Sequence, residues 1–171
     1  MHVLLIFLLG CPTSSSDSGD DAGKTPSFEP SEGAWDGGDY SVKKDSCGLF
    51  EDQSTSTDLD IYTLELRNSG GFDLSVQQDE FTVTWNCDLT KKDFDCPAQV
   101  LAVEDASSQG LDATITVTGA VAGAFSSEDA ASVDISVNGA CDGKDCGTLA
   151  AVAGIDFPCV AELTQPVTHT K

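Results

Sequence analysis

Seven cysteines are the residues of this sequence whose type and spacing point most directly to chemistry. If Cys11 is set aside, the remaining six form an even set: Cys47, Cys87, Cys96, Cys141, Cys146 and Cys159. In an exported chain an even set predicts three disulfides, whose pairing the count alone does not fix. A zinc site is the alternative, and it calls for paired thiolates two residues apart with another pair or histidines nearby. The spacings here are wider, so disulfides are the favoured interpretation.

Residues for catalysis are scarce by comparison. Nucleophilic hydrolysis needs a base beside the nucleophile, and the only histidine after the first ten residues is His169, which we expect in an exposed tail. The sequence contains no Gly-x-Ser-x-Gly elbow, phosphate-binding loop or His-Glu-x-x-His pair. Acidic residues are so numerous that no carboxylate pair of the kind used by glycosidases stands out. We therefore expect no enzyme, no catalytic residue and no cofactor.

The charge balance narrows the class of partner. The chain has 29 acidic and 8 basic residues. Of these, 24 acidic and seven basic residues lie between Ala34 and Lys171, which gives this part a formal charge of −17. Such a field repels phosphate backbones and anionic lipid, which excludes nucleic acid and makes a membrane-lying surface a poor fit. Clustered carboxylates are a source of Ca²⁺ ligands, but neither Asp17 to Asp21 nor Asp142 to Asp145 has the spacing of an EF-hand loop. We interpret the acidity as solubility and predict no metal site.

The first eleven residues are an apolar run that ends in a glycine and a cysteine. The run is shorter than the roughly 20 residues that span a bilayer as a helix. Leu8-Leu9-Gly10-Cys11 resembles the lipobox of bacterial lipoproteins. The resemblance implies that residues 1–10 are a signal peptide and that Cys11 carries a diacylglyceryl group, with an acylated (palmitate-type) amino terminus. Two or more acyl chains anchor a protein stably. Because Pro12-Thr13 lacks the aspartate of the best-known retention signal, the outer membrane is the expected location.

A polar segment, Pro12 to Gly33, follows the cysteine. Phe28 is the one large apolar residue of this segment. We expect the segment to stay disordered, because it can bury too little surface to offset the entropy lost on ordering. A coil of this length has an end-to-end distance of about 25 Å. The expected organisation is therefore a signal peptide over 1–10, a lipidated cysteine and tether over 11–33, and one domain over 34–171.

Apolar residues of the domain alternate with polar ones, which is typical of half-buried strands. Alternation runs through 72–76, 81–87, 111–117 and 133–137, while in 58–67 its phase slips, as at a bulge or a strand buried on both faces. Turn signals separate these runs, no segment has a sustained helical stripe, and at most Ser127 to Ala131 forms one helical turn. We predict an all-β fold, a small antiparallel up-and-down barrel or sandwich of about eight strands, with Trp35 and Trp85 in its core.

The strand pattern also suggests disulfide pairs. Cys87 closes one predicted strand and Cys96 opens the next, so a Cys87–Cys96 bridge across that hairpin is the pairing we favour most. Cys141 and Cys146 flank a turn-like Asp-Gly-Lys-Asp and are candidates for a local pair. If both form, Cys47 and Cys159 are left for each other, which is consistent with neighbouring first and last strands in a closed barrel.

Two resemblances bear on the domain. Gly33-Ala34-Trp35 has the Gly-x-Trp form that precedes the first strand of lipocalins, which implies an eight-stranded barrel that binds a small ligand. The order of Ser46-Cys47-Gly48, the cysteine-clipped hairpin and the Cys-Asp-Gly-Lys-Asp-Cys turn is similar to small lipoproteins of myxobacteria and their relatives. That second resemblance implies an envelope location and no particular activity.

Three functions remain as hypotheses. The first is a lipid-anchored envelope protein with a non-catalytic structural or protein-interaction role, held in the membrane through Cys11 and contacting an envelope protein. An apolar patch rimmed by polar residues would support it. The second is lipocalin-like binding of a small apolar ligand, which requires a cavity lined by the alternating residues. The third is a secreted hydrolase that uses carboxylates, which requires a cleft with perturbed pKa values. We favour the first.

Overall fold

The computed structural model describes residues 28–50, 61–68, 70–78 and 81–171, and most of these residues lie in β-strands. Two short helices interrupt the strands, the 3-10 helix η1 (Ala106–Gln109) and α1 (Cys146–Ala153). The strands are β1 (Gly33–Gly37), β2 (Ser41–Asp45), β3 (Ile61–Leu66), β4 (Phe72–Gln78), β5 (Phe81–Thr90), β6 (Asp93–Asp105), β7 (Thr114–Ser127), β8 (Ala130–Asp142) and β9 (Cys159–His169).

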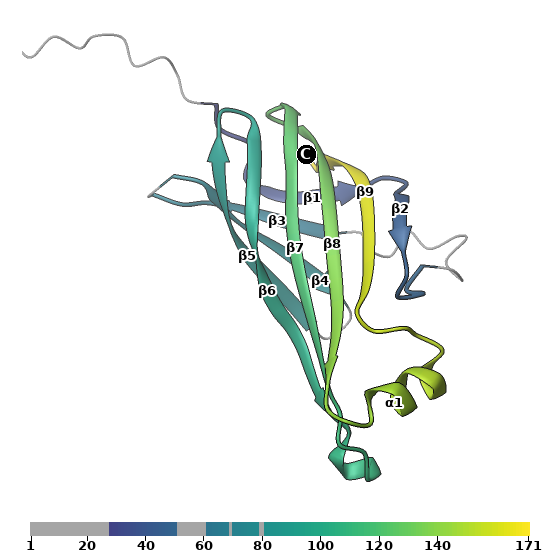
Figure 1. The fold of residues 1–171 in the computed structure, drawn as a ribbon. Coiled ribbons are helices and arrows are strands. Elements are labelled where there is room, and N and C mark those ends of the chain that lie inside the picture. The colour runs from purple at the N-terminus through teal and green to yellow at the C-terminus, as the bar shows by residue number, and fades with distance from the viewer. Residues whose placement is uncertain (1–27, 51–60, 69, 79–80) are drawn as a thin grey trace, which may run out of the picture.

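Eight of these strands close into an antiparallel barrel (Figure 1). The order is β1-β3-β4-β5-β6-β7-β8-β9, and β1 pairs again with β9 to complete the circle. The extra strand, β2, also pairs with β9. β1 lies against residues 167–169, whereas β2 lies against residues 161–164, so the two short strands follow each other along one edge of β9. The predicted all-β antiparallel fold is confirmed, and it is a barrel rather than a sandwich.

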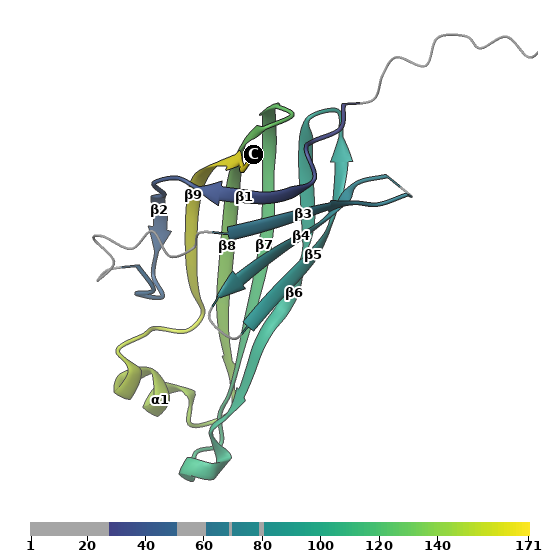
Figure 2. The same ribbon diagram turned by 180° about the vertical axis from the view of Figure 1, so that it is seen from behind.

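The barrel has two different ends. β1, β3 and β4 cross one half of the molecule, where the described chain begins and β9 ends (Figure 2). β6, β7 and β8 are longer and continue away from this end as a three-stranded extension. η1 joins β6 to β7 at the far tip, and α1 lies beside it (Figures 1 and 2).

Aromatic side chains fill the interior of the closed half. The ring of Phe125 has its centroid 5.1 Å from that of Phe94, 5.7 Å from Phe72 and 5.8 Å from Trp35. All four are buried, as is Trp85, so the two tryptophans lie in the core as predicted. Gly123 on β7 makes room for this packing, because a Cβ at that position would lie 2.5 Å from Cζ of Phe94.

The three disulfides form with the predicted partners, Cys87–Cys96, Cys141–Cys146 and Cys47–Cys159. The first crosses from β5 to β6 and lies in the main core. The second joins the end of β8 to the start of α1. The third ties the segment after β2 to the start of β9 and forms a smaller core, where Ala161 is buried and Val137, Phe157, Ile155 and Phe50 are partly buried.

Three local expectations need correction. The packed structure includes residues 28–33, which the sequence placed in the tether: the ring of Phe28 lies 5.5 Å from that of Phe125, and Trp35 donates a hydrogen bond to the carbonyl of Ser31. Ser127 to Ala131 is not a helical turn but the hairpin between β7 and β8. A helix, α1, forms where none was expected. None of its residues is buried, so its sequence lacks the apolar stripe by which a packed helix is recognised.

Candidate functional site: an uncharged face on the long strands

The outer surface of β6, β7 and β8 is built by direct cross-strand pairing. Val100 on β6 pairs with Thr118 on β7, which pairs with Asn138 on β8. One row further along the sheet, Val103 pairs with Thr116, which pairs with Ala140. Directly paired residues point to the same side of a sheet. We call the six residues the uncharged face: Val100, Val103, Thr116, Thr118, Asn138 and Ala140.

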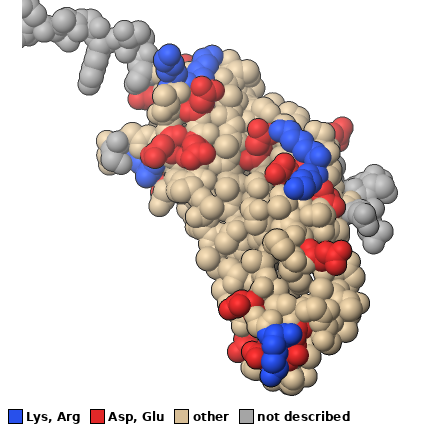
Figure 3. Space-filling view, viewed as in Figure 1, with Lys and Arg blue, Asp and Glu red and all other residues tan. Residues whose placement is uncertain are grey.

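This face lies on the outside of the barrel and is open to solvent. Successive side chains of a strand point to opposite sides of the sheet, and the face uses even-numbered positions of β7 and β8. Odd-numbered positions of the same strands, such as Val121 and Val133, are buried in the core. The two valines of the face are more exposed than most large apolar residues, Val100 by 58% and Val103 by 62%. Figure 3 shows the middle of this side of the molecule without charged side chains, although the protein as a whole is strongly acidic.

Rows with acidic residues bound the face on both sides. Toward the closed half, Asp95 pairs with Ala122, which pairs with Asp134. Toward the tip, Asp105 pairs with Thr114, which pairs with Asp142.

One of these carboxylates has a partner that changes its titration. Lys43 donates from Nζ to Oδ1 of Asp134 over 2.7 Å, and Thr164 donates to the same oxygen. These hydrogen bonds, that from Lys43 first, hold the pKa of Asp134 below its usual value. Asp134 therefore stays ionised at neutral pH, and its charge is paired with that of Lys43.

Next to the face, part of one backbone edge of β6 has no partner strand among the described residues. Asp88 pairs with Asp95, and continuing this register places Cys87 beside Cys96 and then Asn86 beside Pro97. A proline has no N–H to donate, so the β5–β6 ladder ends at the disulfide. From there the two strands are joined by side chains instead. Gln99 donates from Nε2 to the carbonyl of Thr84 over 3.0 Å.

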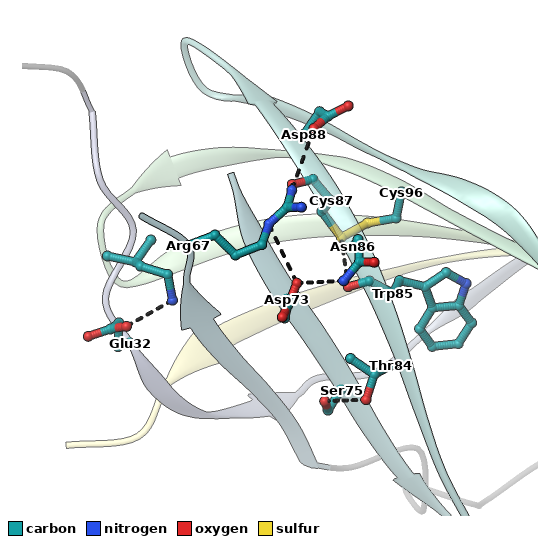
Figure 4. A network of polar contacts seen from close by, with 11 residues as sticks. Glu32, Arg67, Asp73, Ser75, Thr84, Trp85, Asn86, Cys87, Asp88 and Cys96 are labelled. Carbon is teal, nitrogen blue, oxygen red and sulfur yellow. Dashed lines mark hydrogen bonds and ion pairs between the residues drawn. A yellow bond between two sulfur atoms is a disulfide. The ribbon is translucent and has the colours of Figure 1, made fainter. Parts of the chain in front are cut away.

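β5, the strand that diverges from β6, is held in place by a polar network around Arg67 (Figure 4). Nη2 of Arg67 donates to the carbonyl of Cys87 over 2.6 Å, and its Nε lies 3.5 Å from Oδ1 of Asp73. Asn86 donates to the same carboxylate oxygen over 2.7 Å. Gly71, with φ of +73°, lets the turn before β4 pass close to Cys87. The network ties the β3–β4 turn to β5 beside the disulfide, which is a structural role.

His169 is not an exposed tail residue, as the sequence suggested, but the end of β9. Its Nε2 lies 2.8 Å from the carbonyl of Glu32, and its ring packs edge-on to Trp35. Asp129 lies 3.6 Å from Nδ1, but the same oxygen, Oδ1, accepts a hydrogen bond from Ser31 at 2.6 Å. A serine bonded to the carboxylate rather than to the imidazole is not activated as a nucleophile.

Among the described residues, the core of the barrel leaves little space. A cavity lined by aromatic and aliphatic side chains of the main core has a volume of about 10 Å³. This is about the volume that holds one water molecule, and drug-sized ligands occupy sites of several hundred Å³. The filled core is therefore no support for a carrier of the lipocalin kind.

Several expectations fall on residues outside the described ranges, namely Cys11, the signal peptide and most of the tether. Within the described part of the chain, no group of three or more His, Cys, Asp or Glu side chains is arranged to hold a metal ion. Among these residues there is also no helix with the length and apolar composition to cross a bilayer.

The fold thus defines a disulfide-bonded, eight-stranded antiparallel barrel with a filled core and an uncharged outer face. Comparisons with family models, with curated proteins and with solved structures gave no match. The features that point to a function are therefore those of the barrel surface.

Proposed function

We propose that this chain is a lipid-anchored protein of the bacterial cell envelope, and that it binds another envelope protein through the outside of its barrel without catalysing a reaction. The lipobox-like Leu8-Leu9-Gly10-Cys11 supports the anchor, and three disulfides suit an oxidising compartment.

The observation that carries the binding role is the uncharged face. The chain has a formal charge of −21, yet the six side chains of the face carry none, and two of them are exposed valines. A sheet surface kept free of charge between acidic rows suits contact with a protein, because the centres of interfaces are depleted in charged residues. Repulsion by the acidic rows then restricts which partners can approach.

The carrier hypothesis has less support. It needs a cavity inside the barrel, and the cavity lined by the described core residues measures about 10 Å³. A ligand larger than a water molecule would have to displace packed aromatic rings, with a loss of dispersion contacts and core packing. Binding through the outer face needs no such rearrangement.

Site-specific photo-crosslinking in native envelopes tests the proposal. A photoreactive residue replaces Asn138 on the face, and the matched control replaces Val152, which is 81% exposed on α1. We expect a discrete crosslinked protein from position 138 that is absent from position 152. Equal adducts from both positions, or none from 138 and from the neighbouring positions of the face, would contradict a binding role for this surface.

A further inference from the structure

We propose that the free edge of β6 receives an extended segment of the partner, which adds a strand to the sheet. The segment has an uncharged middle and basic residues at both ends. This inference rests on the proposed function and names the class of partner segment that the surface fits.

The edge is available because β5 leaves it. Beyond Pro97 the two strands share no backbone ladder, and Gln99 reaches across to the carbonyl of Thr84. On the side of β6 away from β7, the backbone of residues 100–105 has no partner strand among the described residues. Unpaired N–H and C=O groups along a strand are a template for another extended chain. Val100 and Val103 stand next to this edge, where they would contact side chains of the added strand.

The charges along β6 specify the segment. Asp93 and Asp95 lie near one end of the strand, and Glu104 and Asp105 lie at the other. Residues 96–103 between them contain no charged side chain, and β6 as a whole contains no Lys or Arg. From residue 98 to residue 104, beyond the part of β6 that pairs with β5, an extended strand covers about 20 Å. A segment with apolar and hydroxyl side chains over this length, and lysine or arginine at each end, complements the edge in charge.

A second copy of this chain is a poor fit for the same edge. If two β6 strands paired antiparallel about Val100, Asp95 of one would lie opposite Asp105 of the other. A parallel pair in register would place each acid beside its own copy. Like charges directly opposite one another destabilise a strand pair. Pro97 and the register shifts after Cys96 and after Val100 further disfavour pairing between flat, identical edges.

A synthetic peptide tests the inference on the purified, disulfide-intact protein. The probe is the blocked decapeptide Lys-Lys-Val-Thr-Val-Thr-Val-Thr-Lys-Lys at physiological salt, with binding followed by backbone amide NMR and hydrogen exchange. Three control peptides accompany it. One replaces the four lysines by glutamate. The other two keep every side chain but carry three N-methyl groups on alternate residues, on one edge of the peptide strand in the first and on the opposite edge in the second.

We expect saturable binding of the lysine peptide, with slowed exchange confined to those amides of residues 98–105 that face away from β7. We expect no binding of the glutamate peptide. N-methylation of one edge should weaken binding about tenfold or more, because several strand hydrogen bonds are lost, while methylation of the other edge has little effect. Equal binding of the parent and both methylated peptides would mean charge attraction without strand pairing and would overturn the inference.

Two charge variants of the protein complete the test. Glu104→Lys with Asp105→Lys should weaken the lysine peptide about three- to tenfold. Asp36→Lys with Glu65→Lys makes the same change in net charge at exposed sites on β1 and β3 and should leave specific binding nearly unchanged. Equal weakening by both pairs would overturn the inference. Slowed amide exchange of residues 98–105 through self-association, without peptide, would also overturn it. If the peptide does not bind while crosslinking at position 138 succeeds, the proposed binding role stands, and the partner does not bind by adding a strand to the edge of β6.

Discussion

Replacing Gly123 by alanine tests how tightly the barrel is filled. A Cβ at this position would lie 2.5 Å from Cζ of Phe94 and would overlap the carbonyl oxygen of Ser132. The ring of Phe94 is confined by Phe72 and Phe125, whose centroids lie 5.3 and 5.1 Å away. The carbonyl of Ser132 belongs to the backbone of β8, so it cannot move without disturbing the β7–β8 ladder. Neither the Phe94 ring nor the Ser132 carbonyl can therefore move away to make room for the added methyl group.

The expected change in stability is the balance of two effects. Removing a glycine restricts the unfolded chain and stabilises the fold by about 0.4–1 kcal/mol where the backbone accepts alanine. Overpacking a filled core costs about 1–3 kcal/mol, and a clash with backbone belongs at the upper end. We expect Gly123→Ala to lower the free energy of unfolding by about 2 kcal/mol, which lowers the urea midpoint by about 1 M for an m-value near 2 kcal/mol/M.

The assay is urea unfolding of the disulfide-intact protein, followed by tryptophan fluorescence. Gly147→Ala is the matched control, because a Cβ added to this glycine would meet no atom within 4 Å outside its chain neighbours and the backbone of its own helix, and alanine favours a helix. The control should keep or slightly raise stability. A Gly123→Ala protein as stable as the wild type would refute the filled core and would reopen the case for a ligand inside the barrel.

Two further perturbations have signs that follow from the structure. Removal of the Cys47–Cys159 disulfide should destabilise the protein by about 4–5 kcal/mol and removal of Cys141–Cys146 by about 2 kcal/mol, because the first closes a far longer loop. Urea unfolding of the two double Cys→Ala variants measures these losses. A larger loss for Cys141–Cys146 than for Cys47–Cys159 would contradict the chain-entropy explanation. Asp129 has a pKa lowered by hydrogen bonds from Ser31 and Lys171, so its stabilising contribution should be full above its unfolded pKa near 4 and lost as the pH falls through the lower folded value. The stability difference between wild type and Asp129→Asn should therefore shrink below about pH 4, and a difference that is constant over this range would contradict the assignment.

The sequence predicted most of the strands because their burial follows a period of two. In β5, Trp85 and Cys87 are buried and Thr84 and Asn86 are exposed, as the alternation required. The same logic placed Cys87 and Cys96 on facing strands. Where one face is packed and the other solvated, the pattern of side chains is enough to recognise the strand.

The centre of β7 was harder to recognise. Residues 118–124 are mostly alanine and glycine, which are depleted in strands and give little alternation. Gly119 and Gly123 are present because Leu101 and Phe94 pack against the backbone there. That requirement comes from neighbouring strands and is invisible in the local sequence.

The uncharged face was missed for a related reason. Val100 and Val103 are three residues apart, and the register shift between Val100 and Ala102 brings both to the same side of the sheet. A strict period of two assigns them to opposite sides. His169 was misjudged because its place near the end of the sequence suggested a loose tail, whereas pairing of β9 with β1 fixes it against Trp35.

The measurement that tests the central claim most directly is the intact mass of the protein from the membrane fraction of its native host, before and after reduction and alkylation. The account predicts loss of residues 1–10, an added acyl-glyceryl mass on Cys11, and six further thiols that appear only after reduction. An unprocessed amino terminus would contradict the envelope anchor. Thiols that react without reductant would contradict the disulfide-bonded barrel.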